Sequence, residues 1–112
     1  MINRSAIVVI PKQPFLDWLH RVDPTSRQIT LSELTVEPSI YLIPECETNE
    51  DTFNVLRDLS EEIFVEEFDG WYRDPDTWPP NRSFHLFRSW FDYSHHSILK
   101  DLCKGPLKRH SY

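Results

Sequence analysis

Glycine is scarce in this chain, which holds only Gly70 and Gly105 among its 112 residues. A phosphate-binding loop needs several glycines within a few positions, and the nucleophile elbow of the α/β-hydrolases needs two that flank a serine. Two widely separated glycines can form neither motif, so the sequence excludes nucleotide-binding and hydrolase sites of these types. The nine prolines favour stiff turns over flexible linkers.

Cysteine is equally scarce, and long apolar runs are missing near the N-terminus. Cys46 and Cys103 show no CxxC spacing, so we expect reduced thiols and no disulfide. The run from Ala6 to Ile10 is shorter than the core of a signal peptide and far shorter than the roughly 20 residues that span a bilayer. We therefore expect a cytoplasmic protein with no membrane association.

Apolar and aromatic residues are plentiful by contrast. The chain is 39% hydrophobic and 13% aromatic, which is too apolar for intrinsic disorder. A chain of this length has the commonest size of a single domain. We expect one domain over residues 1–112, built around one core.

Charge is distributed unevenly along the chain. Residues 45–76 carry twelve acidic side chains and two basic ones, a net charge of −10, whereas residues 77–112 carry a net charge of +4 and residues 1–44 are neutral. Binding to a nucleic-acid backbone depends on lysine and arginine. The acidic middle therefore argues against nucleic acid as a ligand and favours a protein partner with a basic surface, or self-association.

Two segments share one order of residues, in which a serine, an apolar run and a proline precede a helical pattern. The first run, Ser5 to Ile10, is rich in β-branched residues and is followed by Pro11. Unbroken runs of this length suit strands covered on both faces, so we expect a central strand. From Pro14 to Val22 the apolar residues recur at helical spacing, which predicts a short amphipathic helix.

The second run spans Ser39 to Ile43 and ends at Pro44, after a possible helical turn over residues 31–34. Thr48 or Asn49 can cap a longer helix that stops at Gly70. Its buried side is expected to carry the apolar residues that recur three and four positions apart (Phe53, Leu56, Leu59, Ile63, Phe64, Phe68). Residues 69–80, dense in turn-forming residues, predict an ordered loop.

Two periodicities compete after Ser83. Phe84, Phe87 and Phe91 fit a helical seam, while Phe91, Tyr93 and His95 also fit one face of a strand. We expect a helix near 83–90 and a strand near 91–102, because two strands alone make a marginal sheet. The predicted fold is α+β with the order β-α-β-α-α-β. It has a small three-stranded mixed sheet, helices mainly on one face, and the first two strands parallel.

Two regions are candidates for partner binding. On the long helix, Glu62 and Glu66 lie four residues apart, so their like charges repel unless a basic group compensates them. In the loop that follows, Trp71, Tyr72 and Trp78 are of the residue types enriched at binding hot spots. The alternative for the loop is that its rings fold back onto the core.

A cluster of possible metal ligands or acid–base groups lies near the C-terminus. Asp92, His95 and His96, followed by Asp101 and Cys103, are suitable residue types for zinc or iron. On a strand, however, His95 and His96 point to opposite faces. The structural alternative is that His95 packs with its apolar neighbours while His96 is solvated.

The function predicted from these features is a non-enzymatic protein-interaction or regulatory protein that uses the acidic helix and the aromatic loop. No cofactor is implied. A small metal-binding protein or enzyme built on Asp92, His95 and His96 is the alternative. A concave pocket lined by histidine and carboxylate would favour the second possibility.

Overall fold

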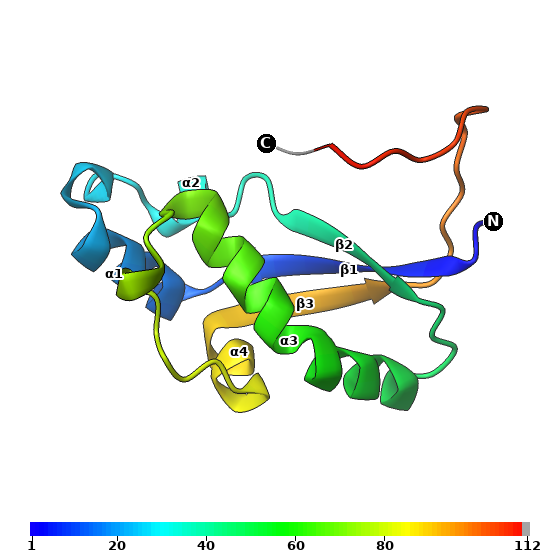
Figure 1. The fold of residues 1–112 in the computed structure, drawn as a ribbon, viewed down its shortest axis with the longest axis horizontal. Coiled ribbons are helices and arrows are strands. Elements are labelled where there is room, and N and C mark those ends of the chain that lie inside the picture. Colours follow the sequence, from blue (N-terminus) through cyan, green and yellow to red (C-terminus); the bar gives the residue numbers. More distant parts are fainter. Residues whose placement is uncertain (111–112) are drawn as a thin grey trace.

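Residues 1–110, the part of the chain that this computed structural model describes, form three strands separated by helices (Figure 1). In chain order the elements are β1 (Arg4–Pro11), α1 (Gln13–Val22), the 3-10 turn η1 (Pro24–Ser26), α2 (Leu31–Leu34), β2 (Ser39–Pro44), α3 (Asn49–Trp71), the 3-10 turn η2 (Pro75–Thr77), α4 (Phe84–Trp90) and β3 (Phe91–His96). The fold is α+β, and the short α2 forms at the expected place. The described residues include no helix long and apolar enough to cross a membrane.

Strand β1 lies at the centre of the sheet, whose order is β2-β1-β3. The expectation of a central strand is therefore confirmed. Ile7 and Val9 are fully buried in the main core, and Ala6 on the opposite face is only 3% exposed. Hydrogen-bonded neighbours flank both edges of β1. Its face opposite the core is not fully covered, since Val8 and Ile10 are only partly buried.

The prediction of a mixed sheet with parallel first and second strands is wrong, because β1 pairs antiparallel with both β2 and β3. Val9, near the end of β1, lies opposite Ser39, the first residue of β2. The intervening helices α1 and α2 both lie at that end of the sheet in Figure 1. The chain therefore re-enters the sheet at the same end at which β1 finishes, and no crossover forms between β1 and β2.

The helical crossover lies instead between β2 and β3, which run in the same direction on either side of β1. Helix α3 passes in front of the sheet in Figure 1. Its hydroxyl-capped start is at Thr48, whose side chain accepts a hydrogen bond from the Asp51 N–H. The helix continues through Gly70 to Trp71, one residue beyond the predicted stop.

Aromatic rings fill the space between α3, α1 and α4. Phe68 is fully buried, and its ring centroid lies 4.6 Å from that of Phe64, 4.8 Å from Trp18 and 5.9 Å from Phe15. Such pairs stabilise a core beyond the area that they bury. Phe53, expected on the buried side of α3, is instead 37% exposed and meets the edge of Phe84.

The helix and strand predicted after Ser83 are present as α4 and β3, but the strand ends at His96 and does not reach residue 102. The register explains the early end. His96 lies opposite Ala6, and β1 itself starts at Arg4, so later residues have almost no strand left to pair with. One further backbone hydrogen bond, from the Ile2 N–H to the Leu99 carbonyl at 2.8 Å, holds the chain before it leaves the sheet.

Candidate functional site

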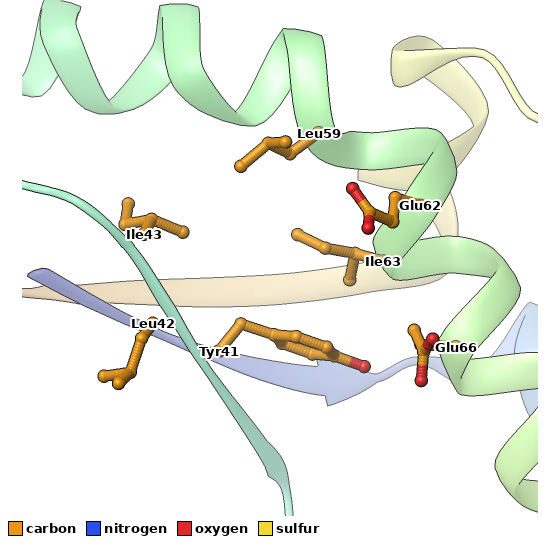
Figure 2. Close-up of a pocket in the computed structure, with 7 residues that line it drawn as sticks. All are labelled: Tyr41, Leu42, Ile43, Leu59, Glu62, Ile63 and Glu66. Carbon is orange, nitrogen blue, oxygen red and sulfur yellow. The ribbon is translucent and has the colours of Figure 1, made fainter. Parts of the chain in front are cut away.

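A groove runs between the edge strand β2 and the helix α3. It encloses a pocket of about 380 Å³. Figure 2 shows the side chains that line it, which come from two neighbouring segments of the chain: Tyr41, Leu42 and Ile43 on β2, and Leu59, Glu62, Ile63 and Glu66 on α3.

The local structure of each element decides which side chains face the groove. On β2, Tyr41 and Ile43 point toward α3 because side chains two residues apart share a face, whereas Leu42 points away in Figure 2. On α3, the residues at positions 59, 62, 63 and 66 follow the spacing of one helical face. The groove therefore has an apolar floor bordered on the helix side by two carboxylates.

Glu62 and Glu66, both predicted as site residues, are exposed at this border. No basic side chain of the described residues compensates their charges through an ion pair. Arg82 pairs instead with Glu61, with 3.6 Å between Nη2 and Oε1. Within residues 1–110 no ion pair involves Glu62 or Glu66, so both charges remain available to a ligand.

A third glutamate, Glu67, was not identified from the sequence, and it lies buried behind the groove at 5% exposure. The Tyr41 hydroxyl and the Ser39 hydroxyl each donate a hydrogen bond to its Oε2 atom, both at 2.7 Å. These bonds attach α3 to β2. Position 67 is four residues after Ile63 and three after Phe64, so the helical spacing places it on the buried side.

Burial controls the titration of this cluster. It raises the pKa of Glu67, because a carboxylate loses its hydration inside the protein; the donated hydrogen bonds from Tyr41 and Ser39 act in the opposite direction. Burial, and then the adjacent Glu67, raise the pKa of Tyr41. The phenol therefore stays protonated and remains a donor at neutral pH.

The aromatic loop lies mostly on the core. Tyr72 and Trp78 pack against the core cluster, and the Trp78 ring stacks on Phe68 with 5.8 Å between centroids. The Trp78 indole N–H donates to the Tyr72 carbonyl at 2.9 Å, and that of Trp18 donates to the Thr77 carbonyl at 2.9 Å. Only Trp71, 42% exposed at the end of α3, is largely open to solvent among the three predicted residues.

Asp92, His95 and His96 do not converge on one point. Asp92 and His96 lie on the face of β3 shared with Ser94, whose hydroxyl is 2.9 Å from Nε2 of His96. His95 points to the opposite face, where its Nε2 is buried without a hydrogen-bond partner. Residues 1–110 contain no group of three or more His, Cys, Asp or Glu side chains that could hold a metal ion.

Comparison with known proteins adds no relative: no family model, no curated protein and no solved structure matches this chain. The function is therefore inferred from the geometry and chemistry of the groove between β2 and α3.

Proposed function

We propose that this protein is a non-enzymatic interaction module whose groove between β2 and α3 binds an extended, basic and apolar segment of a protein partner. One observation carries the proposal: an apolar floor, made by Tyr41, Ile43 and Ile63, is bordered by the exposed carboxylates Glu62 and Glu66 and lies beside an edge strand. The apolar floor suits apolar side chains of the ligand, the carboxylates suit its basic side chains, and the edge strand suits its extended backbone.

The edge strand supports binding of an extended backbone. Strand β2 pairs with β1 on one side only, and an edge strand presents unpaired N–H and C=O groups to any strand that comes alongside it. Recognition by strand addition obtains affinity from these backbone groups and specificity from pockets for alternate side chains. The 380 Å³ pocket next to β2 is such a pocket.

The carboxylates support a basic ligand. Four residues along a helix correspond to a rise of about 6 Å, so Glu62 and Glu66 form a compact negative border to the groove. Complementary charges at an interface steer association and exclude partners of the same sign. Trp71, exposed five positions further along α3, lies about 140° around the helix from Glu66 and is therefore not part of this border.

An enzymatic role has weaker support. The carboxylate with the raised pKa, Glu67, is 5% exposed and already accepts two hydrogen bonds. A general acid or base must reach its substrate directly or through one water molecule. The geometry of Glu67 favours a role in holding β2 against α3.

The test is a comparison of protein partners captured by the wild-type chain and by the double variant Glu62→Lys, Glu66→Lys. The matched control is Glu37→Lys, Glu50→Lys, which makes the same change of net charge at exposed positions outside the groove. We expect partners retained by the control and lost by the groove variant, with capture weakened by salt. Equal capture by all three proteins would contradict the proposal.

A further inference from the structure

The C-terminal segment, residues 98–109, has the properties that the groove requires of a ligand. It contains no helix or strand, and Figure 1 shows it leaving the sheet after β3. Three of its large apolar side chains are exposed to water: Ile98 at 72%, Leu102 at 93% and Leu107 at 71%. Burial of these side chains against a partner would be favourable, because apolar surface would be removed from water.

The charge of the segment is opposite to that of the groove. Residues 98–109 contain four basic side chains, Lys100, Lys104, Lys108 and Arg109, against the single acidic residue Asp101. In an extended chain, side chains two residues apart point the same way and lie about 6.6 Å apart. Leu102 is therefore flanked on its own side by Lys100 and Lys104.

From this match we propose that Leu102 of a second copy of this chain inserts into the groove, with Lys100 and Lys104 directed to Glu62 and Glu66. This inference rests on the proposed function and names the ligand of the same groove. Each chain has one groove and one segment, so two chains can exchange segments around a twofold axis. Closed twofold dimers of this kind are the commonest assemblies.

The length of chain between Leu99 and Leu102 indicates that the Leu102 bound in a groove comes from a second copy and not from the same chain. The Leu99 carbonyl is held by the Ile2 N–H next to β1, and β1 separates β3 from β2. A strand added outside β2 lies three strand spacings from β3, roughly 14 Å. The three residues from Leu99 to Leu102 span at most about 10 Å, so Leu102 of the same chain cannot take the place of a strand added outside β2 while the Leu99 bond is made.

The experiment measures the mass of the full chain by sedimentation velocity over a concentration series at low salt. We expect a concentration-dependent dimer for the wild type and for the control Glu37→Lys, Glu50→Lys. Two variants should be monomeric by themselves: the groove variant Glu62→Lys, Glu66→Lys and the segment variant Lys100→Glu, Lys104→Glu. Leu102→Asp, at a position that is 93% exposed, should weaken dimerisation at least tenfold without affecting the fold.

Mixing the two charge variants gives the decisive result. The basic segment of one variant then meets the acidic groove of the other, and the acidic segment of the second meets the basic groove of the first. We expect a heterodimer to form from two monomeric proteins. Binding of a chain's own segment cannot produce this result.

Three outcomes would overturn the inference: a wild-type chain that stays monomeric at all concentrations, a dimer that persists in either charge variant, or a mixture that remains monomeric. A dimer that persists would place the contact elsewhere, for example on the open sheet face with Ile40 and Leu42, which are 65% and 50% exposed. If the chain stays monomeric but captures a different partner through Glu62 and Glu66, the second copy is rejected while the proposed function stands.

Discussion

Two adjacent glutamates of α3, Glu66 and Glu67, have different surroundings where the helix meets β2. Glu66 lies exposed at the border of the groove, whereas its neighbour Glu67 is buried and accepts hydrogen bonds from Tyr41 and Ser39. One helical step turns a side chain by about 100°, and this rotation separates a carboxylate available to a ligand from one that joins two elements. We propose that the exposed carboxylate contacts a partner, whereas the buried one joins β2 to α3.

Removing both hydrogen-bond donors to Glu67 should have the largest effect on the stability of the protein. The double variant Tyr41→Phe, Ser39→Ala leaves a buried carboxylate without partners, and each hydrogen bond to a charged group contributes roughly 1.5–3 kcal/mol. We expect the free energy of unfolding to fall by about 3 kcal/mol or more, measured by urea denaturation.

The matched control makes the same two changes in a Glu67→Leu background. There the hydroxyl groups have no carboxylate to bind, so the expected loss is about 1 kcal/mol or less. Equal losses in the two backgrounds would show that Tyr41 and Ser39 stabilise the fold without Glu67.

A change of pH should alter the stability of the protein through Glu67 by an intermediate amount. Because burial raises the pKa of Glu67, the folded state keeps its proton at a pH where the unfolded state has lost it. The stability from this proton is fully present below the unfolded pKa, about 4.3, and is lost as the pH rises through the raised folded pKa. Each unit of increase corresponds to about 1.4 kcal/mol.

Comparison with Glu67→Gln isolates this contribution from that of the other carboxylates. As the pH falls from 7 toward 4.5, the free energy of unfolding of the wild type should rise relative to that of the variant. Urea denaturation at several pH values measures the difference. A constant difference, or one that changes in the opposite direction, would contradict the assignment of a raised pKa to Glu67.

The exposed glutamates should have the smallest effect on stability. In the variant Glu62→Gln, Glu66→Gln the repulsion between like charges one helical turn apart disappears, and such pairs cost a few tenths of a kcal/mol. We expect a gain within about 0.5 kcal/mol in thermal denaturation, together with weaker partner binding. A loss of more than 1 kcal/mol would mean that these residues also support the fold.

Much of the local structure could be predicted from the chain itself. The apolar run of β1, the hydroxyl cap at Thr48 and the helical spacing of α3 are properties of short stretches, and all three predicted the elements observed. Glu62 and Glu66 were recognised because their spacing places them together on one helical face. The burial of Glu67 was not predicted, because α3 carries many acidic residues that are exposed. The spacing of Glu67 from Ile63 and Phe64 was the signal that places it on the buried side.

The residue pattern alone therefore predicts the kind and order of the elements, the separation of charge along the chain, and the candidate carboxylates. The tertiary structure decided the direction of β2, the end of β3 at His96, and the packing of Tyr72 and Trp78 on the core. It also decided that Glu66 faces a groove while Glu67 is buried. The physical reason is that local patterns depend on neighbours within one or two turns, whereas strand direction and burial depend on which distant segments meet.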